Sequence, residues 1–245
     1  MTETSASQMG DDEIMPFTKI RRLIAQRMVT SKATSPHALM AREIDYEVVD
    51  QVRRTHGEQF RAREGFGLTY LSFSACAVVQ ALTEFPLLNA SWSDDGLIVH
   101  RSVNLGLAVD LPAGGLVVPV VSSAHLLTLA PMARRVRDLA ERARGGKLTM
   151  DDISGGTFTI TNTGPFGTFL TGAIINQPEV AILATDGIAR RPVVITTPGG
   201  EAVVIRSIGM ASVNFDHRAV DGAYVARFLA RVGVIVAERN WADEL

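Results

Sequence analysis

The sequence predicts an α/β fold of the α+β type, built on a mixed β-sheet with helices packed against it. Stretches with helical apolar spacing alternate irregularly with β-rich stretches, and two turns that contain Gly-Gly join neighbouring β-rich runs. Hydrophobic residues make up 47% of the chain and charged residues 20%, which provides enough apolar side chain for a core. A simple parallel array would alternate strand and helix regularly, and this chain does not.

The polar N-terminus is distinct in composition from the rest of the chain. Residues 1–13 are mostly small and polar, and we interpret them as a flexible tail or a linker remnant. No other stretch has the composition of a linker, so residues 14–245 are predicted to form one domain.

The first half of this domain is predicted to be mostly helical. MPFTKIRRLIAQRMVTSK predicts a helix that Thr18 caps, with apolar residues on one face and basic residues around it. A strand is predicted to begin after Pro36. Residues 47–64 predict a polar helix, and LTYLSFSACAVVQALTEFP predicts an apolar, largely buried helix that Pro86 ends.

Signals for β-strands dominate the second half. VNLGLAVDLPAGGLVVPVV predicts two strands joined at Pro-Ala-Gly-Gly, and TLAPMARRVRDLAERARGGKL predicts an amphipathic helix that Gly145 and Gly146 close. GTFTITNTG and AIINQPEVAILAT are read as short β-rich stretches. RPVVITTPGGEAVVIRSIGMASVNF predicts a hairpin, and a last helix is predicted from Gly222 to Arg239.

Charge and cysteine content restrict the classes of function. The formal net charge is -2, so no general bias toward nucleic acid or anionic membranes follows. Cys76 is the one cysteine, which excludes an intramolecular disulfide, and its apolar setting predicts a buried, inert thiol. The N-terminus lacks a signal-peptide pattern, and no run reaches the roughly 20 apolar residues of a membrane helix. We therefore expect a cytoplasmic protein that binds neither nucleic acid nor membrane.

The stretch NFDHRAVDGAYVARFL contains several ionisable side chains at the point where a strand is predicted to lead into a helix. His217 and Asp221 are four positions apart, the spacing of one helical turn. Histidine, with an ordinary pKa of about 6.5, suits a general base, and Asp221 suits pairing with a cation. Spacing alone leaves open an ordinary strand end followed by a helix-capping aspartate.

Hydroxyl groups alternate along the stretch GGTFTITNTG. Strand alternation sends four of them to one face, where they would be costly to bury without partners. The four residues are Thr157, Thr159, Thr161 and Thr163. The alternative is a solvent-facing strand, which threonine also favours.

Six blocks of the sequence, in this order, resemble the catalytic domain of the dihydrolipoamide acyltransferases, the core components of 2-oxoacid dehydrogenase complexes. The blocks are IRRLIAQRMVTSKATSPH, FPLLNASW, NLGLAVDLPAGGLVVPVV, GGTFTITNTGPFG, IINQPEVAIL and FDHRAVDGAYVARFL. The resemblance covers residues 14–239. It implies a fold shared with chloramphenicol acetyltransferase and identifies residues 14–245 as the acyltransferase catalytic domain.

The resemblance also implies a reaction. A short acyl group moves between dihydrolipoamide and coenzyme A, which are substrates, and no metal is implied. His217 removes the proton of the attacking thiol, Thr161 donates a hydrogen bond to the oxyanion, and Asp221 acts structurally through an arginine near the N-terminal helix. The sequence leaves that arginine open between Arg21, Arg22 and Arg27.

Assembly follows from the same resemblance. We expect a homotrimer with its active site between subunits. Such trimers would in turn assemble into a cage of 24 subunits. The expected partners are a lipoyl domain and the dehydrogenase and dihydrolipoamide dehydrogenase components. The C-terminal ERNWADEL departs from the apolar tails that dock on neighbouring trimers in the family, and Trp241 and Leu245 are its candidate anchors.

The nature of the acyl group is a separate prediction. Phe166, Phe169 and Leu170 favour an acetyl or branched-chain acyl group over succinyl. Two alternatives to the whole interpretation remain open from sequence. One is a standalone enzyme that acetylates a small alcohol or amine, as chloramphenicol acetyltransferase does. The other is a scaffold of the complex that has lost turnover.

Overall fold

The computed structural model describes residues 14–112 and 114–245, so the predicted N-terminal tail lies outside the described residues. Its centre is a seven-stranded sheet with the order β1-β9-β8-β7-β4-β5, in which β6 also pairs with β4. The strands are β1 (His37–Asp45), β4 (Leu105–Asp110), β5 (Leu116–Val117), β6 (Val120–Val121), β7 (Phe158–Asn162), β8 (Ala181–Thr197) and β9 (Gly200–Asp216). Strand β7 is parallel to both neighbours and the other pairs are antiparallel, which confirms the predicted mixed sheet.

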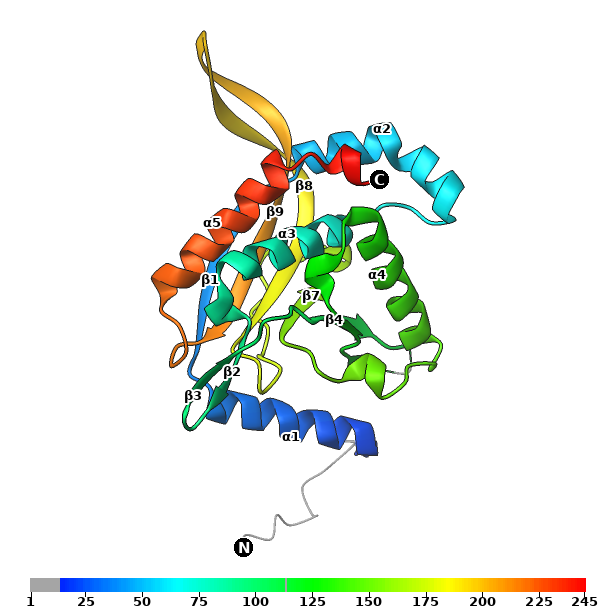
Figure 1. Cartoon of the computed structure of the whole chain (residues 1–245), viewed down its shortest axis with the longest axis vertical. Helices are drawn as coiled ribbons and strands as arrows, with labels where there is room; N and C mark the ends of the chain where they lie inside the picture. Colours follow the sequence, from blue (N-terminus) through cyan, green and yellow to red (C-terminus); the bar gives the residue numbers. More distant parts are fainter. Residues whose placement is uncertain (1–13, 113) are drawn as a thin grey trace, which may run out of the picture.

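Helices cover one face of this sheet (Figure 1). The helices are α1 (Lys19–Thr34), α2 (Glu47–Glu64), α3 (Tyr70–Glu84), α4 (Leu129–Arg144) and α5 (Gly222–Glu238). Helix α3 is buried on most sides, as its apolar sequence predicts. Phe73 on α3 and Phe228 on α5 are fully buried. Each such side chain contributes about 1.5–3 kcal/mol to folding, so α3 and α5 anchor the sheet that carries the site.

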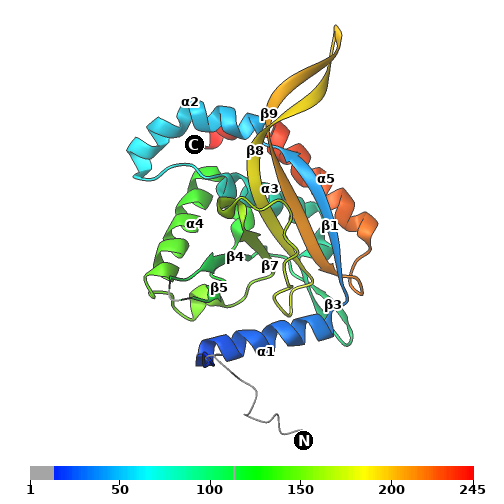
Figure 2. The ribbon, with the colours of Figure 1, turned by 180° about the vertical axis from the view of Figure 1, so that it is seen from behind.

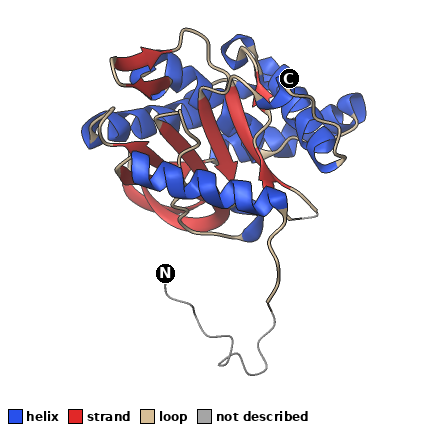
Figure 3. Ribbon diagram, turned by 90° about the horizontal axis from the view of Figure 1, so that it is seen from below, coloured by secondary structure: helices blue, strands red, loops and turns tan. Residues whose placement is uncertain are grey.

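A loop rather than a helix lies over the other face at β8 and β9 (Figure 2). It is tied down where Ser212 donates to the carbonyl of Thr171 over 2.7 Å and where Gly187 N–H donates to the carbonyl of Thr168. Helix α1 crosses below the strand ends, apart from the other helices (Figure 3). Its Thr18 cap is confirmed, because the Thr18 hydroxyl accepts from Arg21 N–H.

One predicted β-rich stretch is wrong in part. In AIINQPEVAILAT the strand begins only at Ala181. The polar groups before it have other partners, since Ile175 N–H donates to His37 Nε2 and the Ile175 carbonyl accepts from Ser31. These side-chain bonds replace the ladder that a strand would need.

Strands β8 and β9 continue beyond the body of the sheet as a two-stranded arm (Figures 1 and 2). The arm is defined here as residues 191–206, whose pairing runs from Arg191 opposite Arg206 to Thr197 opposite Gly200. Ion pairs fix its base, with Arg191 bound to Glu43 and Arg206 bound to Asp45. Apolar side chains are exposed along it, among them Val194, Val203 and Ile205.

The C-terminal residues fold back onto the rest of the chain. Trp241 has no exposed surface, and its indole N–H donates to the carbonyl of Val236. Glu244 binds Arg239 and accepts from Leu129 N–H, which fixes the short helix Trp241–Glu244 against α4. Trp241 is therefore a core residue here, and the expectation of a free apolar anchor at this position is wrong for a chain in this conformation. No helix of the described residues is long and apolar enough to cross a membrane.

Candidate active site

His217 occupies the first position of the turn that follows β9. Its N–H donates to the carbonyl of Pro36 over 3.1 Å, and Asp216 N–H donates to the carbonyl of Val180 over 2.8 Å. The turn is therefore attached to the starts of both β1 and β8. The imidazole is exposed and rests against the buried ring of Phe215 at 5.6 Å between centroids. A rigid backbone thus presents a histidine that is accessible from outside the subunit.

Asp216 and Arg218, the residues on either side of His217, form an ion pair. The Arg218 guanidinium donates to both carboxylate oxygens of Asp216, with Nε at 3.0 Å from Oδ1 and Nη2 at 2.6 Å from Oδ2. Burial by itself raises the pKa of Asp216, but the bonds from Arg218 and from the Ser35 hydroxyl outweigh it and hold the pKa below its ordinary value. Asp216 is therefore an ionised, paired carboxylate directly before the candidate base.

Asp221 stands at the N-cap position of α5. Its side chain is exposed and makes no capping bond. None of the three candidate arginines of α1 pairs with it within the described part of one chain. The next residue, Gly222, packs against Met40: a Cβ there would lie 2.6 Å from the Met40 methyl group, so that flexible side chain would have to move to admit a larger residue.

Thr161 lies near the end of β7, between Ala108 on β4 and Ala184 on β8. It is half-buried, and small neighbours leave room beside its hydroxyl. The preceding threonines of this face are buried instead, with Thr157 donating to Asn89 and Thr159 donating to Glu179. The strand is shorter than predicted: Thr159 and Thr161 lie within it, two positions apart and so on one face, whereas Thr157 and Thr163 lie outside it. The solvent-facing alternative is wrong for Thr157 and Thr159, which are buried.

Within one chain the structure does not bring Thr161 and His217 together. Thr161 on β7 pairs with Ala184 on β8, and Ala184 pairs with Ser212 on β9. His217 follows Ser212 by five residues, so Thr161 and His217 are separated by two strand spacings across the sheet and by five residues along β9. At about 3.4 Å per residue and about 4.8 Å per strand, their backbones are separated by roughly 19 Å. A hydrogen bond or a shared substrate atom between them therefore requires a second copy of the chain.

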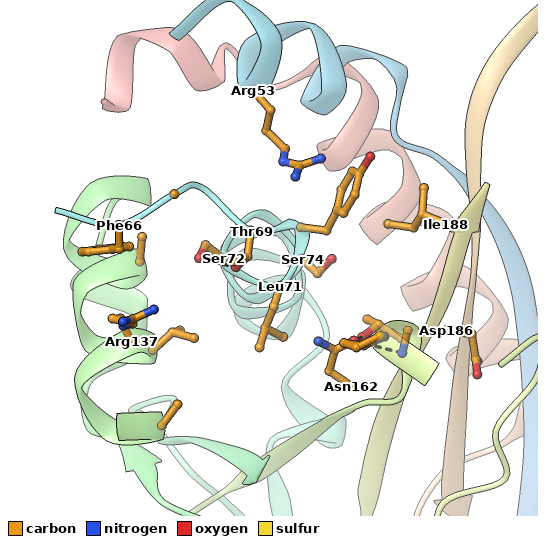
Figure 4. Close-up of a pocket in the computed structure, with 18 of the residues that line it drawn as sticks. Arg53, Phe66, Thr69, Leu71, Ser72, Ser74, Arg137, Asn162, Asp186 and Ile188 are labelled. Atoms are coloured by element: carbon orange, nitrogen blue, oxygen red, sulfur yellow. Dashed lines mark hydrogen bonds between the residues drawn. The ribbon is translucent and has the colours of Figure 1, made fainter. Parts of the chain in front are cut away.

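A cavity of about 490 Å³ opens beside the end of β7, between α2, α3 and α4 (Figure 4). Asn162, which follows Thr161, lies in its wall, as do Arg53, Arg137 and Arg144. Arg53 is packed over the Tyr70 ring at 4.0 Å. A smaller cavity of about 240 Å³ adjoins it at Asn162 and Arg144; Asp110 also lines this cavity, and its other lining residues are apolar. They include Leu107, Val109, Ile160 and Phe166.

Two polar residues near the site were not assigned a role from sequence. His37 is structural: its Nε2 accepts from Ile175 N–H, so its Nδ1 carries the proton and donates to the Ser35 carbonyl over 2.7 Å. Glu179 is buried beside a cleft that α1 borders, and burial raises its pKa to about 7. Its Oε2 has no partner among the described residues. A glutamate within an apolar PEVAIL run is a signal that sequence reading could have used. No group of three potential metal ligands lies together in residues 14–112 and 114–245.

Solved structures establish the class of fold. A chloramphenicol acetyltransferase superimposes with a TM-score of 0.52 at 12% identity, covering 86% of this chain and 94% of that chain, which shows a common fold. A dihydrolipoamide acetyltransferase of Azotobacter vinelandii, solved to study a serine, a histidine and an asparagine in catalysis, gives a TM-score of 0.89 at 31% identity, covering 97% of this chain and 96% of that chain. The cubic core of a pyruvate dehydrogenase multienzyme complex matches equally well, with the same TM-score, identity and coverage.

The family follows from sequence. The model of the 2-oxoacid dehydrogenase acyltransferase catalytic domain matches residues 9–241, and the chain belongs to this family. The lipoamide acyltransferase component of the Bacillus subtilis branched-chain α-keto acid dehydrogenase complex is 40% identical over 96% of this chain and 54% of its own length. An acetyltransferase component of Corynebacterium glutamicum is 38% identical over 93% of this chain and 34% of its own length. A succinyltransferase component of Haemophilus influenzae is 35% identical over 94% of this chain and 55% of its own length.

These comparisons fix the family and leave the acyl group unresolved, because relatives with three different acyl groups have similar identities. The chain spans about half the length of the first of these relatives. In the Azotobacter enzyme the histidine and asparagine under study are four positions apart, as are His217 and Asp221 here.

Proposed function

We propose that this domain transfers a short acyl group between dihydrolipoamide and coenzyme A, as the core of a 2-oxoacid dehydrogenase complex. The observation that carries the proposal is the exposed imidazole of His217 on a turn whose start is hydrogen-bonded to Pro36 and Val180, at the family's four-residue spacing from Asp221. Lipoyl domains and the dehydrogenase and dihydrolipoamide dehydrogenase components are the corresponding partners.

The reaction follows from thiol chemistry. A thiol has an ordinary pKa of about 8.5, so little thiolate is present at neutral pH. The imidazole of His217 takes the S–H proton as the sulfur attacks the carbonyl carbon of the thioester. The tetrahedral oxyanion receives a hydrogen bond from Thr161, worth about 3–4 kcal/mol for one well-aimed donor. Collapse breaks the original C–S bond, and the imidazolium returns the proton to the departing sulfur.

Acyl transfer in the variant His217→Ala tests the role of the base. We expect a loss of about 100-fold to 10,000-fold in kcat, because general base catalysis contributes this much. The variant should keep its thermal midpoint and its sedimentation coefficient. Undiminished turnover in a folded variant would overturn the mechanism.

We propose that the complete site lies between two subunits of a trimer, with Thr161 from one copy and His217 from the next. The proposal is supported by the separation of roughly 19 Å between these residues in one chain. Co-assembly of His217→Ala chains with Thr161→Ala chains tests it. In a symmetric ring with random mixing, about one quarter of the sites have both native residues, so mixed trimers regain activity that neither variant has alone. If the site belonged to one chain, mixing would restore nothing.

We propose that the arginine-bordered cavity of Figure 4 receives the phosphate-bearing part of coenzyme A. Arg53, Arg137 and Arg144 line it, and guanidinium groups match phosphate geometry. The cavity reaches Asn162 beside Thr161, so a thiol arm could extend from it toward the oxyanion donor. Arg144→Gln is expected to raise KM for coenzyme A while leaving KM for dihydrolipoamide unchanged.

We propose an acetyl or branched-chain acyl group as the natural cargo. The small cavity beside Asn162 is bordered mainly by apolar residues, among them Leu107, Ile160 and Phe166, which favour an apolar acyl chain. Its two charged lining residues, Asp110 and Arg144, have opposite signs and so give no net charge that selects a succinyl carboxylate. Kinetic comparison of acetyl-, isobutyryl- and succinyl-coenzyme A tests this. A kcat/KM for succinyl-coenzyme A above the other two would contradict the proposal.

A further inference from the structure

We propose that Trp92 is a positioning residue for His217: its indole face holds the Arg218 guanidinium, which binds Asp216 and so fixes the turn that carries the imidazole. This inference rests on the proposed role of His217 as the general base. Trp92 lies outside the turn, on the small hairpin of β2 (Ala90–Ser93) and β3 (Gly96–Val99).

The Arg218–Asp216 pair is a brace across the candidate base. The two residues flank His217, and the fork between their side chains closes a short loop with His217 at its apex. Arg218 N–H also donates to Asp216 Oδ1 over 2.9 Å, so backbone and side chain act together. A change in the position of the guanidinium therefore moves the residue between them.

Arg218 alone does not determine its own position. Its side chain is 32% exposed, while that of Asp216 is 1% exposed, so water reaches the pair from the arginine side. The Trp92 ring packs against the guanidinium, whose carbon lies over the ring at 4.3 Å from its centroid. An aromatic face at this distance attracts the cation and restricts it to one plane.

The hairpin that carries Trp92 and the turn that carries His217 are both hydrogen-bonded to the same short segment, residues 178–180. Trp92 N–H donates to the Pro178 carbonyl, Val180 N–H donates to the Ala90 carbonyl, and Asp216 N–H donates to the Val180 carbonyl. Trp92 is thus hydrogen-bonded to Pro178 and Asp216 to Val180, in the segment that leads into β8. This shared attachment fixes where the indole stands relative to the turn.

The brace is expected to affect kcat more than substrate binding, because it orients the imidazole and does not itself contact a substrate. A displacement of about 1 Å at a reacting group costs on the order of 100-fold in rate. We therefore expect Trp92→Leu, which keeps apolar volume and removes the ring, to lower kcat about tenfold with KM for both substrates within twofold. Trp92→Phe keeps a ring face and should retain most of the native kcat.

A double-mutant cycle separates this coupling from a general loss of structure. Arg218→Lys retains the charge but cannot fork onto Asp216 or stack flat on the ring. If Trp92 acts through Arg218, the double variant Trp92→Leu with Arg218→Lys should be no slower than the slower single variant. Ile98→Ala, on the same hairpin and 53% exposed, is the matched control and should leave kcat unchanged.

Three results would overturn the positioning role. They are a native kcat in folded Trp92→Leu, additive losses in the double variant, and a raised KM for coenzyme A at unchanged kcat, which would assign Trp92 to substrate binding. His217→Ala measured in parallel keeps the two proposals distinct. An inactive His217→Ala with a native Trp92→Leu refutes only the brace, whereas an active His217→Ala refutes the proposed base.

Discussion

Trp241 and Phe73 meet edge to face, with their ring centroids 5.2 Å apart and their planes at 80°. The contact joins the last turn of the chain to the most buried helix of the core. Arg239 lies over the outer face of the same indole at 4.7 Å. The C-terminal residues are therefore part of the folding unit of this domain.

Trp241→Ala is expected to destabilise the domain by about 3–5 kcal/mol, because it removes a fully buried aromatic side chain and leaves a cavity. Trp241→Phe should cost less, since it keeps a ring against Phe73. Urea unfolding followed by circular dichroism measures both values. A cost below about 1 kcal/mol for the alanine variant would mean that Trp241 leaves the core in solution.

Glu179→Gln is expected to make the free energy of unfolding less dependent on pH. Burial raises the pKa of Glu179 to about 7 in the folded state, above its ordinary value of 4.5. The folded state therefore binds this proton more tightly than the unfolded state. The resulting stabilisation is complete below about pH 4.5 and is lost as pH rises to about 7, by on the order of 3 kcal/mol in all.

The measurement is the free energy of unfolding of both proteins at pH 5 and pH 8. The native protein should lose more stability than Glu179→Gln between these two values. Parallel curves would show that the carboxyl group finds a cationic partner or water in solution.

Much of the fold could be predicted from sequence, and the reasons are local. The helix at 47–64 and the stop before Pro86 follow from apolar spacing and from the backbone limits of proline. The positions of Thr161 and His217 relative to each other could not be predicted, because they depend on the pairing register across β8. The Trp92–Arg218 contact joins residues 126 positions apart, and neither residue has a local pattern that indicates it.

Cys76 is expected to resist thiol reagents in the native protein. Burial raises its pKa to about 12, so almost no thiolate forms at pH 8. Ellman's reagent should label it slowly under native conditions and rapidly in urea. Rapid native labelling would contradict the predicted inert thiol.

Asp221→Asn is expected to keep more activity than Asp221→Ala. The Azotobacter relative was studied for an asparagine four positions after its histidine, and an amide preserves the size and one acceptor oxygen of the carboxylate. Steady-state kcat at saturating substrates measures the difference. Equal losses in both variants would show that the negative charge itself, paired with a cation of another subunit, is what matters.

The arm of β8 and β9 leaves apolar side chains and unpaired backbone edges accessible to other molecules. Val194, Val203 and Ile205 are 62%, 72% and 64% exposed on a ribbon with two open backbone edges, and Glu201 is the single charged residue between Pro192 and Ile205. Pro192 and Pro198 lie at the base and at the tip of this ribbon, but no lysine protects the apolar stretches between them and beyond them from pairing with the wrong neighbour. The tip of the arm is thus the part of a free chain most prone to adhere to another strand, and a contact that covered it would lower the tendency of the chain to aggregate.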